Sequence, residues 1–189
     1  ASCNGVCDGV ASSSISGGSL PYTYLWDDPS NQTTPSATGL CARTYCVTVT
    51  DSKGCLDSSC IVVSEPGVLT ANISSIDVLC NGDGNGMAIT NPAGGNPPYT
   101  YLWNDPMAQT TDTASGLAPG NYCVLLTDSL GCADAACINV AEPAILSSTP
   151  DSTDISCFGL CDGEATAVVV GGTTPYFYLW DDLSNQTSN

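Results

Sequence analysis

The residues of this 189-residue chain with the clearest chemistry are its 12 cysteines. Cysteines form disulfide bonds, bind zinc or act as nucleophiles. The chain has no histidine and no Cys-x-x-Cys pair, so the ligand spacing of a zinc site is missing. A high density of cysteines is typical of small extracellular domains that are held together by disulfides. We therefore expect disulfide bonds and an oxidising, extracellular compartment.

The cysteines recur with a fixed period, which indicates tandem repeats. Cys3, Cys80 and Cys157 are 77 residues apart, and three Pro-Tyr-x-Tyr-Leu-Trp segments follow the same period. Repeat arrays usually position, span or adhere. Because the third copy stops halfway, we interpret the chain as part of a longer protein. The expected domains are a first repeat at residues 1–65 without its first strand, a complete second repeat at 66–142, and a partial third repeat at 143–189.

Differences between the copies predict one disulfide. The second copy lacks both Cys7 and Cys41 and has Gly84 and Ala118 at those positions. Joint loss is what a bonded pair would show, so we expect a Cys7–Cys41 bond. Cys161 restores the first half of this pair in the third copy, and its partner would lie beyond the chain.

Strand periodicity predicts the remaining pairs. Alternation over residues 45–50 directs Tyr45, Val47 and Val49 to one face and Cys46 to the other. A hairpin then places Cys46 opposite Cys60, within reach of a disulfide. By elimination, the other pairs follow: Cys3–Cys55 in the first repeat, Cys80–Cys132 and Cys123–Cys137 in the second, and Cys157 with a partner beyond the chain.

Each repeat has the pattern of an all-β domain. Short alternating or β-branched runs, such as residues 99–103 and 122–127, are separated by Gly, Pro, Asn and Asp. About seven short strands in roughly 75–80 residues indicate tandem immunoglobulin-like antiparallel β-sandwiches, stapled by disulfides. Each short junction contains one proline, Pro66 or Pro143, which limits hinge freedom. We therefore expect the repeats to form a rod.

The aromatic residues allow two interpretations. Tyr22, Tyr24 and Trp26 fall on one face of a predicted strand. Such a face could stack on sugar rings, or it could fill the core of a sandwich. The solvent exposure of the tryptophan would separate these alternatives. Tyr45 and Tyr122, which open the penultimate strands, resemble tyrosine-corner residues whose hydroxyl bonds the nearby backbone.

Calcium is the one cofactor that the acidic residues suggest. Asp8, Asp83 and Asp162 lie in Gly-Asp loops and are candidate ligands, with a plain Gly-Asp turn as the alternative. Residues 81–86 resemble the start of a calcium-binding loop. Pro92, however, stands where such a loop needs a bidentate glutamate. The helical type of calcium site is therefore excluded.

Several residues are candidate glycosylation sites. Asn31, Asn72 and Asn185 begin Asn-x-Ser/Thr sequences, the acceptor pattern for N-glycans. Thr113 and Ser129 lie in short Asp-Ser/Thr-apolar sequences that resemble the O-glycan acceptors of Bacteroidota.

The charge and the polar residues exclude several functions. With 19 acidic and two basic residues, the net charge is -17, so nucleic acid and anionic lipid surfaces are poor partners. No histidine is present to act as a base near neutral pH, and the carboxylates sit singly in turns. We therefore predict no enzymatic activity, no nucleic-acid partner and no membrane insertion in this segment.

Several spaced motifs together resemble a known family. They are Cys-Asn-Gly at Cys3 and Cys80, Gly-Gly-x-x-Pro-Tyr-Thr-Tyr-Leu-Trp, Leu-Ala-Pro-Gly-Asn-Tyr-Cys-Val, Thr-Asp-Ser-x-Gly-Cys and Glu-Pro. This pattern is similar to the SprB-type repeat of large Bacteroidota surface adhesins. The resemblance implies immunoglobulin-like units in a secreted surface filament of the gliding-motility type. Cys3 and Cys55 match the family's cysteines, whereas the additional cysteines of the first repeat make this an unusually cross-linked version.

From these observations we expect a structural and adhesive segment of a bacterial extracellular filament. Its partners would be neighbouring repeats of the same chain or filament, and surface glycans are a further candidate. Two alternatives stay open: glycan-binding accessory repeats of a secreted protein, and a disulfide-linked filament subunit.

Overall fold

The structure is a computed structural model that describes residues 1–182 and 186–188. In this part of the chain all regular elements are β-strands, and no helix has the length and apolar character needed to cross a membrane. The strands are β1 (Gly9–Ser12), β2 (Thr23–Trp26), β3 (Ser36–Leu40), β4 (Arg43–Thr50), β5 (Leu56–Val63), β6 (Thr70–Ile76), β7 (Gly86–Ala93), β8 (Thr100–Trp103), β9 (Thr113–Leu117), β10 (Gly120–Thr127), β11 (Ala133–Val140), β12 (Ser147–Thr153) and β13 (Glu164–Val170).

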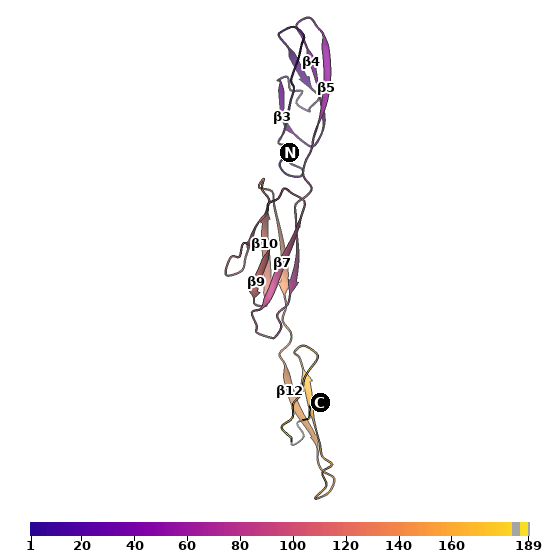
Figure 1. Ribbon diagram of the computed structural model, residues 1–189, viewed down its shortest axis with the longest axis vertical. Helices are drawn as coiled ribbons and strands as arrows, with labels where there is room; N and C mark the ends of the chain where they lie inside the picture. The colour runs from indigo at the N-terminus through magenta and orange to yellow at the C-terminus, as the bar shows by residue number, and fades with distance from the viewer. Residues whose placement is uncertain (183–185, 189) are drawn as a thin grey trace. The chain divides into compact units, whose positions relative to one another are not determined.

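The first repeat is a two-layer antiparallel sandwich. One sheet pairs β1 with β3, and the other has the order β2-β4-β5. Figure 1 shows β4 and β5 running side by side. Both sheets contribute side chains to one core, which consists of Ala11, Trp26, Ala37, Leu40, Tyr45, Val47 and Val63.

The alternating sequence of β4 decides which of its side chains enter this core. Tyr45 and Val47 are both 2% exposed, because successive side chains of a strand point to opposite faces. Cys46 therefore lies on the other face, directly opposite Cys60 of β5. Trp26 is 1% exposed, and its indole N–H donates to the carbonyl oxygen of Thr34 at 3.0 Å.

The second repeat has the strand order of an immunoglobulin domain. Its sheets are β6-β7-β9 and β8-β10-β11. These correspond to strands A, B and E in one sheet and C, F and G in the other. The predicted all-β, immunoglobulin-like fold is thus confirmed. Positions equivalent to the first core are again buried: Ala88, Trp103, Ala114, Leu117, Val124 and Val140.

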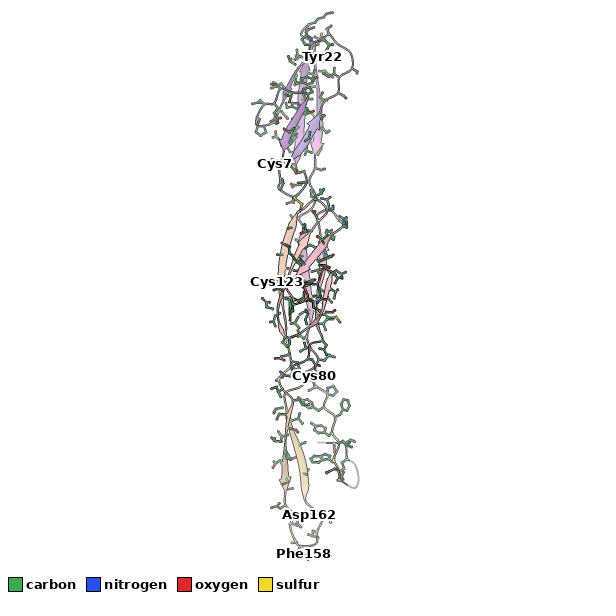
Figure 2. All side chains as sticks on the ribbon, turned by 90° about the vertical axis from the view of Figure 1, so that its left-hand side faces the viewer. Cys7, Tyr22, Cys80, Cys123, Phe158 and Asp162 are labelled. Carbon is green, nitrogen blue, oxygen red and sulfur yellow. A yellow bond between two sulfur atoms is a disulfide. The ribbon has the colours of Figure 1, made fainter. Side chains whose placement is uncertain are left out.

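The third repeat contains one antiparallel hairpin in the described residues. Ser147 of β12 lies opposite Val170 of β13, and the pairing continues to Thr153. The connecting turn contains Phe158 and Asp162 (Figure 2).

The chain divides into two compact units. The first comprises Ala1–Asn72, Asn91–Leu102 and Val124–Ala136, which is the first repeat with one end of the second. The second comprises Ile73–Thr90, Trp103–Cys123 and Cys137–Asn189. The repeat boundaries expected at residues 65 and 142 stay a prediction.

Replacing Trp26 by alanine should destabilise the first repeat by about 3–5 kcal/mol, because it leaves a large cavity between the sheets. The matched control is Leu25→Ala on the same strand, where the side chain is 52% exposed. This change should stay within about 0.5 kcal/mol. Amide hydrogen exchange in β2 and β4 measures both effects locally. Equal acceleration in the two variants would show that Trp26 is not the centre of the core.

Candidate functional site: the junction between consecutive repeats

One end of each repeat carries a turn that begins at a cysteine, here called the cysteine turn. In the first copy the N–H of Val6 donates to the carbonyl oxygen of Cys3 at 3.1 Å, and Gly5 has a φ of 74°. A positive φ favours glycine, which explains the Cys-x-Gly spacing. The turns that begin at Cys80 and Cys157 have the same bond and the same kind of glycine.

A polar side chain farther along the chain holds the residue before each cysteine. The carboxylate of Asp8 accepts the N–H of Ser2 at 2.8 Å, and that of Asp162 accepts the N–H of Ser156 at 3.0 Å. Asn85 takes this position in the second copy. Hydrogen bonds from the side chain and backbone of Ser2 lower the pKa of Asp8, so this carboxylate is charged at neutral pH.

These contacts give two of the three calcium candidates a role in the cysteine turn. Asp8 and Asp162 both close such a turn, whereas Asp83 is not at the equivalent position and accepts the side-chain amide of Asn85 at 3.2 Å. Within residues 1–182 and 186–188, no three His, Cys, Asp or Glu side chains are grouped so that they could hold a metal ion. Calcium binding stays a prediction.

The linker that leaves each of the first two repeats is bonded to the cysteine turn of that repeat. The side-chain amide of Asn4 donates to the carbonyl oxygen of Pro66 at 3.1 Å, and the N–H of Gly5 donates to the Glu65 carboxylate at 2.7 Å. The second copy repeats both bonds, from Asn81 to Pro143 at 3.0 Å and from Gly82 to Glu142 at 2.9 Å. The Cys-Asn-Gly and Glu-Pro motifs are therefore partners, a relationship that the sequence analysis missed.

The other end of a repeat is built around an aspartate, and is here called the acceptor turn (Asp51–Cys55 and Asp128–Cys132). Three backbone N–H groups donate to each carboxylate. For Asp128 the donors are Asn96, Leu130 and Cys132, at 2.8, 2.9 and 2.9 Å. For Asp51 the donors are Ser19, Lys53 and Cys55, at 3.0, 2.9 and 2.9 Å. The two acceptor turns therefore have the same internal structure.

These hydrogen bonds lower the pKa of both aspartates. Burial acts to raise the pKa of Asp128, but the backbone N–H groups, chiefly those of Asn96 and Cys132, outweigh it. The N–H of Cys55 is the main cause of the lowered pKa of Asp51. Since the folded pKa lies below the unfolded value of about 3.9, each contribution to stability is complete above that pH. It is lost as the pH falls through the folded pKa.

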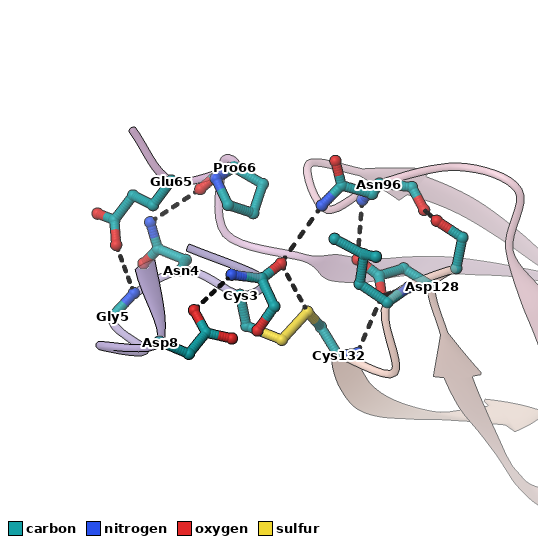
Figure 3. Close-up of a disulfide and its surroundings, with 12 residues drawn as sticks. Cys3, Asn4, Gly5, Asp8, Glu65, Pro66, Asn96, Asp128 and Cys132 are labelled. Carbon is teal, nitrogen blue, oxygen red and sulfur yellow. Dashed lines mark hydrogen bonds between the residues drawn. A yellow bond between two sulfur atoms is a disulfide. The ribbon is translucent and has the colours of Figure 1, made fainter. Parts of the chain in front are cut away.

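A disulfide joins the cysteine turn of the first repeat to the acceptor turn of the second. Cys3 is bonded to Cys132, with 5.7 Å between their Cα atoms (Figure 3). The side-chain amide of Asn96 donates to the carbonyl oxygen of Ser2 at 3.4 Å, and the Sγ atom of Cys132 lies 3.5 Å from that oxygen. The cysteine turn of one repeat thus docks on the acceptor turn of the next.

The predicted Cys3–Cys55 and Cys80–Cys132 bonds are wrong. Cys132 is taken by Cys3, and Cys55 and Cys80 are free and exposed. The mistaken step was the elimination, which assumed that each repeat closes its bonds within itself.

The length of β4 explains why a Cys3–Cys55 bond within the first repeat cannot form. The cysteine turn precedes β1, whose Gly9 pairs with Leu40, next to the start of β4. The acceptor turn follows the far end of β4. The eight residues of β4 span about 26 Å at ~3.3 Å per residue, whereas a disulfide needs Cα atoms within about 7 Å.

The other predicted disulfides are present. Cys7–Cys41, Cys46–Cys60 and Cys123–Cys137 are all bonded. The last two are cross-strand pairs of the final hairpin in their repeats. Cys157 and Cys161 are free and exposed. Their partners beyond the chain stay a prediction.

The structure places the tryptophans in the core. Trp26 and Trp103 are each 1% exposed, so neither offers a face on which a sugar could stack. Tyr122 forms the expected tyrosine corner, donating from its hydroxyl to the carbonyl oxygen of Ala118 at 2.9 Å. At Tyr45 the structure shows the Arg43 guanidinium carbon 4.4 Å from the ring centroid.

The candidate glycosylation residues differ in access. Asn31 and Asn72 are exposed. Thr113 is half-buried at the start of β9, and the Ser129 hydroxyl donates to the carbonyl oxygen of Asn96 at 2.9 Å. Asn185 lies outside the described residues. Glycosylation of these residues stays a prediction.

The fold and the junction define a tandem array of immunoglobulin-like repeats, the first two of which share a disulfide. A family model described as "SprB repeat" matches residues 1–31, 72–108 and 149–185, more than half of the chain. The chain belongs to the SprB repeat family.

Two solved structures resemble the chain at 12% sequence identity. The amphioxus IgVJ-C2 molecule aligns over 72% of this chain and 97% of its own, with a TM-score of 0.35. The N-terminal four immunoglobulin domains of Dscam1 isoform 9.44 align over 73% of this chain and 41% of their own, with a TM-score of 0.36. No curated protein matches the chain.

Peptic digestion of the oxidised chain at acid pH, where thiols do not exchange, should yield a peptide pair linked through Cys3 and Cys132. Mass spectrometry identifies the pair, and it should disappear in the Cys3→Ser/Cys132→Ser variant. The Cys46–Cys60 pair serves as the control, because it should persist in that variant. Recovery of Cys3 linked to Cys55, or of Cys80 linked to Cys132, would contradict the junction described above.

Proposed function

We propose that this chain is a structural and adhesive segment of a long bacterial filament, exported and displayed at the cell surface. Membership of the SprB repeat family supports a repeat module of the adhesin type. The observation that carries the proposal is the Cys3–Cys132 bond, since a covalent link between consecutive repeats serves a chain that transmits force.

The bond shortens the path along which tension travels. Force applied to the two ends passes from Cys3 directly to Cys132 and bypasses the segment between them, which covers a sequence separation of 129. That segment contains the strands β1 to β10 and hence the whole core of the first repeat. The core of the first repeat is therefore shielded from tension as long as the disulfide is intact.

Surface composition also suits exposure outside a cell. The net charge of -17 opposes association between chains. Cross-strand disulfides such as Cys46–Cys60 staple the final hairpin in each of the first two repeats. Because Trp26 and Trp103 are buried, the alternative of a glycan-binding module loses its tryptophan stacking surfaces. A filament segment is therefore the better-supported function.

Single-molecule stretching tests the load path. The reduced chain should extend farther than the oxidised chain by about 430–460 Å, which is ~3.3–3.6 Å per residue over the sequence separation of 129. The Cys3→Ser/Cys132→Ser variant should also extend farther under oxidising conditions. Cys46→Ser/Cys60→Ser is the matched control, because that loop lies inside the bypassed segment, and it should not change the extension. Equal lengths for the oxidised and reduced chains would mean that the disulfide bears no load.

Surface display is tested on intact cells that produce the protein. An antibody against the folded second repeat should label unpermeabilised cells, and brief external protease treatment should remove the signal. A cytoplasmic protein labelled in parallel controls for leakage. Labelling that requires permeabilisation would exclude the surface filament.

A further inference from the structure

The acceptor turn of the first repeat is fully built, yet it has no partner within the described residues. The Asp51 carboxylate holds the N–H groups of Ser19, Lys53 and Cys55 in the same way as Asp128 does in the occupied turn. The thiol of Cys55 is free and exposed. It borders a hollow of about 220 Å³, so a partner can reach it.

We propose that this acceptor turn is a docking site for the cysteine turn of an adjacent repeat, joined by a disulfide to Cys55. The inference deepens the proposed filament function and rests on it. The reference is internal to the chain, because the equivalent Cys132 is bonded to Cys3 and Asn96 donates to the carbonyl oxygen of Ser2. Asp128 in turn holds the N–H groups of Asn96 and Cys132. The preferred occupant is therefore a second turn of the same type.

The chain also contains free cysteine turns. The turn at Cys80 has the internal hydrogen bond of the docked turn at Cys3, and Asn85 holds the N–H of Leu79 at 3.0 Å. Its thiol is free and exposed. The two halves of a junction are thus preformed at different places, and each lacks a partner in this part of the chain.

Two residues of the acceptor site differ between the copies: Lys53 replaces Leu130 and donates through its backbone N–H as Leu130 does, and Ser19 replaces Asn96. Ser19 stands where Asn96 donates its side-chain amide to the docked turn. The backbone at this position has the same hydrogen bond in both copies. The N–H of Ser52 donates to the carbonyl oxygen of Ser19 at 3.0 Å, and the N–H of Ser129 donates to that of Asn96 at 2.9 Å. The first repeat therefore has the same backbone frame, with the shorter Ser19 hydroxyl in place of the Asn96 amide that donates to the docked carbonyl oxygen.

The bond forms by thiol–disulfide exchange with a small disulfide as the oxidant. The incoming cysteine is first held as a mixed disulfide with a small thiol. The Cys55 thiolate attacks the sulfur of that cysteine, so the new S–S bond forms while the bond to the small thiol breaks. The small thiol leaves with the electron pair. The oxidising equivalents come from the small disulfide, and the exchange step itself causes no net oxidation.

The experiment uses a synthetic peptide of residues 77–86, which contains the cysteine turn together with Asn85. The peptide and glutathione compete for the free thiols of the full chain, and mass spectrometry measures the exchange constant at each cysteine. The constant at Cys55 should exceed that at Cys80 by about tenfold, since Cys80 has no acceptor turn around it. A change of Ser19→Asn should raise the constant at Cys55 a further few-fold, because it restores the side-chain amide that reaches the docked carbonyl oxygen in the second repeat.

A control peptide makes the test specific. A peptide carrying Gly82→Val and Asn85→Leu keeps the thiol but cannot form the turn, and it should show no preference for Cys55. Equal constants at Cys55 and Cys80 would overturn the docking site, as would a control peptide that competes as well as the native one. Neither result would bear on the proposed filament function, because the stretching experiment that tests it depends on Cys3 and Cys132 alone.

Discussion

The disulfide between Cys3 and Cys132 joins two repeats whose individual cores are small. The core of the first repeat consists of seven side chains, two of them alanines. A domain of this size buries a modest fraction of its surface, and its core alone supplies little stability. A disulfide that closes a loop of more than 100 residues lowers the entropy of the unfolded chain. In the chain-entropy model this stabilises the folded state by about 4–5 kcal/mol. The stability of each repeat therefore depends on its neighbour as well as on its own packing.

Acidic side chains organise the turns that this disulfide connects. Asp128 and Asp51 each accept three backbone N–H groups, and Asp8 accepts one beside the cysteine turn. Charged acceptors form stronger hydrogen bonds than neutral ones, and the lowered pKa values keep these groups charged. The high acidity of the chain thus has two effects, since some carboxylates hold turns while the net charge of -17 keeps chains apart.

Local patterns were sufficient to predict the fold and part of the cross-linking. Alternation along residues 45–50 gave the correct inward face and the opposition of Cys46 and Cys60, because both follow from a period of two. Joint loss identified Cys7 and Cys41 without reference to geometry. Carboxylates in Gly-Asp loops, by contrast, left both a plain turn and a calcium site open, because hydrogen bonds to backbone N–H groups leave no signature in composition.

The long-range pairing of Cys3 could not be derived from spacing, for a reason that applies to any tandem repeat. In a sequence of fixed period, a bond to Cys55 within one repeat and a bond to Cys132 in the next use the same two types of position. Periodicity therefore cannot distinguish them. The arrangement of the strands does distinguish them. The cysteine turn and the acceptor turn of the first repeat lie at opposite ends of β4, and only the next copy presents its acceptor turn beside Cys3. When the bonding positions lie at opposite ends of the unit, the same rule makes every cross-link of this type a link between units, and a chain of small domains becomes one covalent network.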